Sequence, residues 1–228
     1  MNNKEELTTI KYEVDGNEIK LSPAIVKNYI TGGVDLTDSE YKFFVELCKV
    51  RKLNPFLKEA YAIKFADNQP AQIVVGKDAI VKRAVKHPKF NGKQQGVIVI
   101  NDKGEIIERK GTFKLPTETL VGGWAKVYRK DWQYPTEVTV SFDEVAQKKK
   151  DGVLNSNWLT KGATMVEKVA VVRALKETFI EDLSGMIDED EAWPVKDLHA
   201  RKTQTEVMEQ HDPIEATITE KVVSLDEL

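Results

Sequence analysis

Cysteine and histidine are scarce in this 228-residue chain, which contains one cysteine and three histidines. A single cysteine excludes an internal disulfide framework and suits a reducing compartment. So few thiol and imidazole groups also leave no ligand spacing for a zinc site. Cys48 falls on the apolar face of an expected helix, so we interpret it as a core residue rather than a nucleophile.

Long hydrophobic segments are also missing. No run of about 18 apolar residues occurs, so the sequence predicts no membrane-spanning helix. The first residues, Met-Asn-Asn-Lys-Glu-Glu, lack the apolar centre of a signal peptide. We therefore expect a cytoplasmic protein without a membrane partner, large enough for one core and an appended tail.

Nucleotide-binding and catalytic motifs are absent as well. Gly76-Lys77 lacks the glycine that a phosphate loop needs near Gln72, and Asp78 stands where serine or threonine is required. Gly122-Gly123 opens a strand, so it is not a dinucleotide fingerprint. Asp188–Glu191 are consecutive acids, whereas two-metal nucleases disperse theirs over strands. We expect no cofactor and no catalytic residue, with a metal-dependent DNA nuclease using these acids as an alternative.

Charge is divided unevenly along the chain. Residues 177–228 contain 15 acidic and 4 basic residues, whereas residues 1–176 contain 22 acidic and 30 basic residues. A basic body with an acidic tail points to a polyanionic partner. The tail has few aromatic residues and no strong period, so we predict flexibility for about 195–228, apart from a short helical pattern around Thr203–Gln210.

The N-terminal third predicts two hairpins and three helices. Alternating apolar residues on either side of Asp15-Gly16 predict a β-hairpin over residues 8–21, and Ser22-Pro23 opens a short helix through Tyr29. Thr37 and Glu40 form a capping box for the next helix. A second hairpin spans residues 61–75, and a helix follows from 76 to 86, with Lys89 and Lys93 in the loop beyond it.

Residues 96–142 predict an antiparallel meander of four strands, followed by a short helix over 143–150. The last connection, Tyr128–Pro135, combines Arg129 and Lys130 with three aromatic residues. Cations interleaved with aromatic rings are typical of surfaces that bind single-stranded nucleic acid. The alternative is a surface hairpin whose rings cover the sheet.

The longest predicted helix runs from about Thr160 to Phe179. Its apolar residues cover most of the circumference, as expected of a buried helix. Four cations fall within an arc of roughly 140° at about 100° per residue; they are Lys161, Lys168, Arg173 and Lys176. Two interpretations are open, because these side chains could contact an anionic partner or pair with acids such as Glu167 and Glu177.

Five separated motifs together resemble the RecT/Bet (Red beta) family of phage and prophage single-strand annealing proteins, over about residues 37–180. Each motif stands in the family's order. They are Asn54-Pro-Phe-Leu-Lys-Glu-Ala-Tyr61, Val75-Gly-Lys-Asp78, Phe90-Asn-Gly92, Val127-Tyr-Arg-Lys-Asp131, and Trp158 with Met165-x-x-Lys168 and Arg173.

The resemblance implies an α+β fold, in which a twisted antiparallel sheet packs on the long helix. It implies a homo-oligomer, ring or helical filament, that binds single-stranded DNA and anneals it without ATP into a duplex. Residues 1–36 would make oligomer contacts, 37–185 would form the annealing core, and 186–228 the acidic tail. A non-catalytic DNA-repair adaptor is a further alternative.

The resemblance also assigns residues and partners. The cations of a basic DNA groove would be Lys58, Lys130, Lys161, Lys168 and Arg173, with Arg129 and Lys77 from the same motifs beside them. A phage exonuclease and a host single-strand-binding protein are the implied partners. The family's helical C-terminal domain, which makes such contacts, is reduced here to the acidic tail. Stacking of Trp132 or Trp158 on bases is left open.

Overall fold

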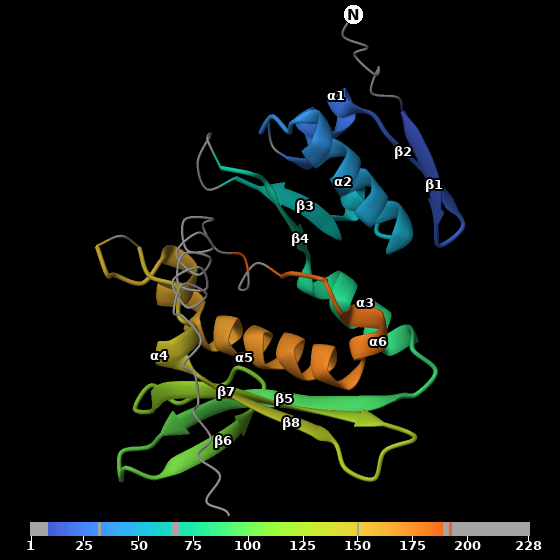
Figure 1. The fold of residues 1–228 in the computed structure, drawn as a ribbon. Coiled ribbons are helices and arrows are strands. Elements are labelled where there is room, and N and C mark those ends of the chain that lie inside the picture. Colours follow the sequence, from blue (N-terminus) through green and yellow to red (C-terminus); the bar gives the residue numbers. More distant parts are fainter. Residues whose placement is uncertain (1–8, 32, 65–68, 150, 189–191, 193–228) are drawn as a thin grey trace, which may run out of the picture. The chain divides into compact units, whose positions relative to one another are not determined.

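A four-stranded antiparallel sheet carries the long helix (Figure 1). In the computed structural model its strands are β5 (Phe90–Ile100), β6 (Ile106–Lys110), β7 (Thr119–Arg129) and β8 (Thr136–Ser141). The order is β6-β5-β7-β8, so β7 pairs with β5, whereas a meander would pair it with β6. The expected meander order is therefore corrected. β5 and β7 have 11 residues each against five in β6, so their pairing satisfies more backbone groups.

Helix α5 (Ser156–Thr178) packs on this sheet, mainly against β7 and β8. It begins four residues before the predicted start, because the Asn155 side chain accepts a hydrogen bond from Trp158 N. A Cβ on Gly123 would lie 2.7 Å from the Val166 carbonyl oxygen, so glycine permits the close approach of helix and sheet. At Lys161 the backbone departs from helical geometry, with φ −131°.

Two short helices flank α5. α4 (Phe142–Val145) is shorter than the helix predicted over 143–150, because an isolated bridge pairs Lys148 with Leu154. α6 (Ile180–Leu183) follows α5 directly. The strand β5 begins at Phe90 rather than Val97, which places Lys93 in the sheet and not in a loop.

The N-terminal elements mostly follow the predictions. β1 (Ile10–Val14) and β2 (Asn17–Leu21) pair around the predicted turn, where Asp15 and Gly16 have φ values of 49° and 80°. The predicted helix after Ser22 is α1 (Pro23–Ile25) continued by the π-helical turn η1 (Val26–Ile30). α2 (Asp38–Val50) carries the predicted capping box. The Tyr12 hydroxyl donates to the Leu53 carbonyl and attaches the hairpin beside α2.

Between α2 and the large sheet lie the 3-10 turn η2 (Pro55–Leu57), the paired strands β3 (Ala60–Ile63) and β4 (Gln72–Val75), and helix α3 (Lys77–Lys86). α3 contacts α5, α6 and β5. One hydrophobic cluster joins these layers and includes Phe44 of α2, Ile80 of α3 and Leu175 of α5. Cys48 belongs to it and is fully buried, which confirms the prediction of a core residue.

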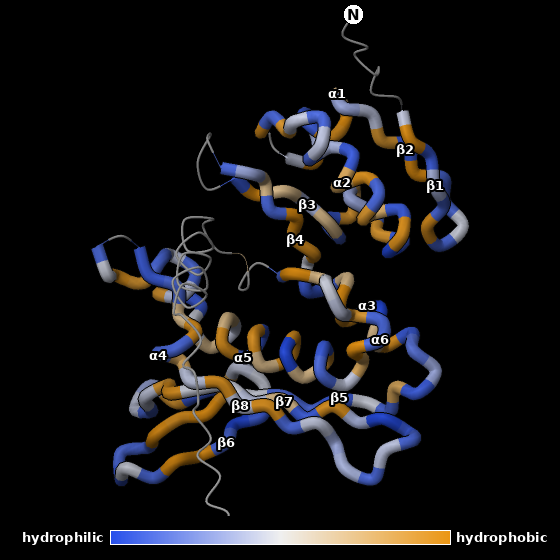
Figure 2. The backbone as a smooth tube through the Cα atoms, in the orientation of Figure 1, coloured by the Kyte–Doolittle hydropathy of each residue, from blue (hydrophilic) through white to orange (hydrophobic). Residues whose placement is uncertain are grey.

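The structure describes residues 9–31, 33–64, 69–149, 151–188 and 192. Hydropathy mapped on the backbone shows that α5 mixes hydrophobic and hydrophilic residues along its length (Figure 2). Within the described ranges, no helix has the length and apolar character needed to span a membrane. The mixed α+β class with antiparallel sheets is confirmed. Most of the predicted acidic tail, and the helical pattern at Thr203–Gln210, lie outside the described residues.

Candidate nucleic-acid interface

The loop Asn54–Ala60 is folded so that it projects Lys58. The Asn54 side chain accepts from Phe56 N at 3.0 Å and caps η2. Lys58 then adopts the left-handed region at φ 57° and is exposed. The buried carboxylate of Glu59 accepts from Asn54 N at 2.7 Å and closes the loop. This sequence motif therefore encodes a rigid support for one exposed lysine.

Lys58 precedes β3 and Lys77 follows β4, at the same end of the paired strands. Ala60 pairs with Val75, and Gly76 N donates to the Glu59 carbonyl at 3.1 Å, so the same register continues beyond the strands. A Cβ on Gly76 would lie 2.7 Å from the Lys58 carbonyl oxygen, so this approach requires glycine. Two motifs separated in sequence thus bring the backbone of Lys58 against the residue that precedes Lys77.

Lys93 of β5 is the third cation of this region. It is half-buried, and its ammonium group hydrogen-bonds the Gln95 side chain. Burial, followed by the positive charge of Lys77, lowers the pKa of Lys93, while Glu167 of α5 opposes the shift. α3, which begins with Lys77, contacts β5, and the charge of Lys77 acts on Lys93, so we group the two residues. We call Lys58, Lys77 and Lys93 the basic cluster.

The basic cluster surrounds the start of α3, where Gly76 is the N-cap and provides no side-chain acceptor. The first amide groups of a helix and its dipole favour an anion at this end. Exposed Asp78 adds one negative charge in the same turn. Among the described residues, neither Lys58 nor Lys77 forms an ion pair. These ammonium groups are available to an anionic ligand.

The cations of α5 differ in their surroundings. Lys161 is exposed at the kink of the helix and has no ion pair within the described part of the chain. Lys168 is half-buried. Arg173 approaches Glu144 of α4 at 3.6 Å, with 42% and 66% of the two side chains exposed. Such an exposed pair is weak, so it does not prevent Arg173 from contacting a phosphate.

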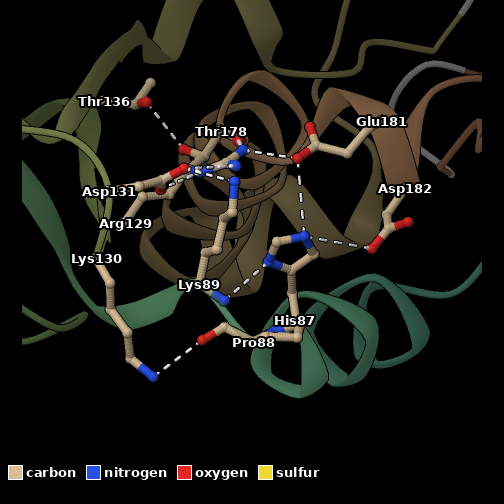
Figure 3. Close-up of polar contacts among 10 residues, drawn as sticks. All are labelled: His87, Pro88, Lys89, Arg129, Lys130, Asp131, Thr136, Thr178, Glu181 and Asp182. Carbon is tan, nitrogen blue, oxygen red and sulfur yellow. Dashed lines mark hydrogen bonds and ion pairs between the residues drawn. The ribbon is translucent and has the colours of Figure 1, made fainter.

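Arg129 lies in a different environment at the end of β7 (Figure 3). Its side chain is only 6% exposed. The guanidinium donates to the Thr178 carbonyl and to Glu181, both at 2.8 Å, and to Asp131 at 3.1 Å. It also stacks on the Trp132 and Phe179 rings, 4.8 and 5.3 Å from their centroids. Arg129 therefore connects the β7–β8 turn to the end of α5.

The neighbouring cations complete what we call the Arg129 junction. Lys89 pairs with Asp131 at 2.7 Å, and the exposed Lys130 donates to the Pro88 carbonyl at 2.9 Å (Figure 3). Hydrogen bonds from Lys89 and then Arg129 lower the pKa of Asp131 to about 2. The His87 ring lies 4.8 Å from Phe179 and faces Glu181. The structure thus brings the sequence-predicted Arg129 and Lys130 to a junction rich in carboxylates.

The tryptophans in question also differ. Trp158 is 1% exposed and packs edge-on against Phe142, with ring centroids 5.6 Å apart. Its indole is therefore part of the core that anchors the start of α5. Trp132 is 44% exposed, with the Arg129 guanidinium against its ring. Tyr134 in the same turn is 74% exposed.

A metal centre has little support in this part of the molecule. Over the described ranges, no group of three or more histidine, cysteine or acidic side chains is arranged to hold a metal ion. Asp188 of the predicted acidic cluster is buried. Glu189, Asp190 and Glu191 lie outside the described residues.

Comparison with protein families is consistent with this geometry. The family model of the RecT family matches residues 16–207. The chain belongs to the RecT family. These are phage proteins of DNA recombination that bind single-stranded DNA and anneal it, and they are generally non-catalytic. A search of curated proteins finds no match to the chain.

The residues that match the RecT family model include both the basic cluster and the Arg129 junction. Sequence reasoning missed the position of Lys93, which it placed in a loop. The signal was present, because Lys93, Gln95, Val97 and Val99 alternate on one face of β5. Gly92 and Gly96 interrupted the apolar pattern and concealed the start of the strand.

Proposed function

We propose that this protein binds single-stranded DNA through the basic cluster and anneals complementary strands without ATP. The observation that supports it is the convergence of Lys58, Lys77 and Lys93 from three elements, two of them without an ion pair in the described chain. A row of lysines holds phosphates without reading base edges. The bases then stay available for a second strand, which annealing requires.

The cations of α5 extend this surface. α3 packs against α5, and Glu167 acts on Lys93, so the basic cluster and the middle of α5 are neighbours. We include Lys161, Lys168 and Arg173 in the groove on this basis. Lys130 and Arg129 belong to the Arg129 junction, and we assign them a lesser part, with Lys130 as the exposed member.

Assembly into a ring or helical filament would repeat this groove along a strand. Each subunit presents few cations, so one groove alone binds weakly. Repetition converts successive contacts into intramolecular ones and raises the overall affinity. Base pairing provides the driving force of the reaction, so no nucleotide hydrolysis is needed. An exonuclease and a host single-strand-binding protein stay predictions from the family, as does a role for the tail.

Annealing of complementary oligonucleotides tests the proposal. We expect the protein to accelerate duplex formation at moderate salt, equally with and without ATP. The variant Lys58→Ala/Lys77→Ala should lose most of this acceleration, because it removes the two ammonium groups of the basic cluster that form no ion pair in the described chain. Lys49→Ala/Lys89→Ala, which removes two cations that pair with Glu46 and Asp131, is the matched control.

Four outcomes contradict the proposal. Equal rates with and without protein across salt and oligonucleotide length exclude annealing. Equal losses in the two double variants would mean that net charge, not the basic cluster, is responsible. Shortening of labelled DNA in the presence of magnesium or manganese would favour the nuclease alternative. Light scattering with and without DNA tests the adaptor alternative. A particle size that does not change when DNA is added would favour an adaptor over an annealing oligomer.

A further inference from the structure

A second group of cations surrounds a cavity of about 250 Å³. The cavity lies between the β1–β2 turn, the residues after α2, and α3. None of the lysines of the basic cluster lines it. Its charged walls carry four cations and three acids, namely Lys52, Lys82, Arg83, Lys86, Asp15, Glu59 and Asp182.

Asp15 bridges two of these cations. Lys82 and Lys86 stand one turn apart on α3 and bind the two carboxylate oxygens of Asp15 at 2.8 and 2.7 Å. Hydrogen bonds from both ammonium groups lower the pKa of Asp15 to about 2. The bridging carboxylate is 48% exposed and stands at the tip of a hairpin. It is therefore open to exchange with a ligand from solution.

The other cations of the cavity form no ion pair within the described residues, although the negative charge of Asp182 acts on Arg83. Within the described residues, Lys52 forms no ion pair. Arg83 donates to the Arg51 carbonyl, and burial lowers the pKa of Arg83. Glu59 is already bound by Lys82 at 2.6 Å and by a backbone amide. The walls consequently hold one more positive than negative charge. Of the wall acids, Asp15 is the one that bridges two lysines, and its side chain and that of Asp182 are both partly exposed, at 48% and 42%.

We propose that this cavity is a second phosphate-binding site for a nucleic-acid strand, in which the Asp15 carboxylate occupies the place of a phosphate until a strand displaces it. Carboxylate and phosphate oxygens accept hydrogen bonds from lysine in the same way. An ion pair this exposed is weak, so a phosphodiester can compete with it. This proposal depends on the proposed function in one respect, that the protein binds DNA.

The consequence concerns the second strand. A protein that anneals DNA must hold one strand and also bind a second, complementary strand. The groove that contains the basic cluster would hold the first strand. The cavity would be a weaker site, because the Asp15 carboxylate competes with phosphate and lowers its affinity for DNA. Such a site would bind the incoming strand and then release the product duplex. Without the competing carboxylate, the strand would be held more tightly and released more slowly.

The variant Asp15→Asn tests the proposal, because asparagine is equally favoured at the positive φ of this turn. Glu18→Gln on the same hairpin is the matched control, since it also removes one exposed acid paired with a lysine. Binding of a labelled oligonucleotide is measured by fluorescence anisotropy over a range of salt. We expect Asp15→Asn to bind about three- to tenfold tighter, with a salt slope larger by about 0.7, the value for one added phosphate contact.

A second variant locates the effect. Adding Lys52→Gln to Asp15→Asn should return the slope to the wild-type value, because it removes the unpaired cation of the cavity. Equal affinities and slopes for Asp15→Asn and Glu18→Gln would overturn the second site. Inorganic phosphate at matched ionic strength should reduce the gain, because it competes for the same ammonium groups; a gain that phosphate leaves unchanged would also overturn the site.

Failure of the annealing proposal gives a different pattern. In that case the wild-type protein would not accelerate duplex formation, and Lys58→Ala/Lys77→Ala would not change the rate. If the wild type binds through the basic cluster while Asp15→Asn behaves like its control, only the second site fails. Thermal unfolding of each variant verifies that the hairpin stays folded.

Discussion

The two ends of α3 present the same residue types in opposite states. At its start, the basic cluster holds three lysines, of which Lys58 and Lys77 have no ion pair among the described residues. Beyond its end, the Arg129 junction holds Arg129 and Lys89 against two carboxylates, those of Asp131 and Glu181. Availability to a phosphate thus depends on what surrounds a cation, not on its presence in a motif.

Burial explains the difference. Arg129 is enclosed by α5, α6 and the β7–β8 turn, and a buried cation requires acceptors on every donor. Its partners come from three separate segments, at Asp131, Thr178 and Glu181. Lys58 is exposed at the surface and its own backbone is in the left-handed region, so its ammonium group is accessible to solvent. The first arrangement stabilises the fold, and the second leaves charge for a ligand.

The largest expected effect is on the stability of the junction. Arg129→Ala should lower the free energy of unfolding by about 2 to 4 kcal/mol, because it orphans the Thr178 carbonyl and opens a space beside Phe179. Urea denaturation measures it. Lys130→Ala, one residue away and exposed, is the control and should change the value by less than about 0.5 kcal/mol. Similar losses in both variants would contradict a special role for Arg129.

A smaller effect is expected on DNA binding. Lys77→Ala should weaken affinity for single-stranded DNA about three- to tenfold and reduce the salt slope by about 0.7, while stability stays near the wild-type value. Lys89→Ala should leave the slope unchanged, because Asp131 neutralises Lys89 in the folded protein. Fluorescence anisotropy titrations of a labelled oligonucleotide over a range of salt compare the two variants with the wild type. A lower slope for Lys89→Ala would remove the contrast between the two regions.

The smallest effect concerns acid. The folded-state pKa of Asp131 is about 2, below the ordinary aspartate value of 3.8, so the ionised form is favoured by folding. Its contribution to stability is therefore complete above the ordinary value and is lost as pH falls toward 2. The stability difference between wild type and Asp131→Asn should be constant near neutrality and shrink between pH 4 and 2. A constant difference throughout would exclude this carboxylate as a charged partner.

Much of the local structure followed from sequence pattern. The Asp15-Gly16 turn and the Thr37–Glu40 capping box formed where local chemistry placed them. The strand order did not follow, because the register between β5 and β7 depends on contacts between residues far apart in the chain. The π-helical turn after Ile25 and the kink at Lys161 were not predicted either. Gly162 stands next to the kink, but a single glycine inside a helical pattern does not specify a break.

The residues of the candidate site also fall into those that sequence motifs indicated and those that only the fold revealed. Lys58, Lys77 and Arg129 were all selected from motifs, and the sequence alone could not distinguish them. Lys93 joined the site only when the full length of β5 was known. Asp15 was recognised as a turn residue, but its two lysine partners lie more than 60 residues away. Periodicity contains no information on such long-range pairs.

The sequence by itself determined the α+β composition of the chain, its basic body and its family, because these depend on residue types and local order. Tertiary structure decided which cations stay available. Gly76 permits the Lys58 loop to approach the start of α3, while the end of α5 encloses Arg129. The strength of a charge in a protein depends on its distance from other charges and from water, and only the folded chain sets those distances.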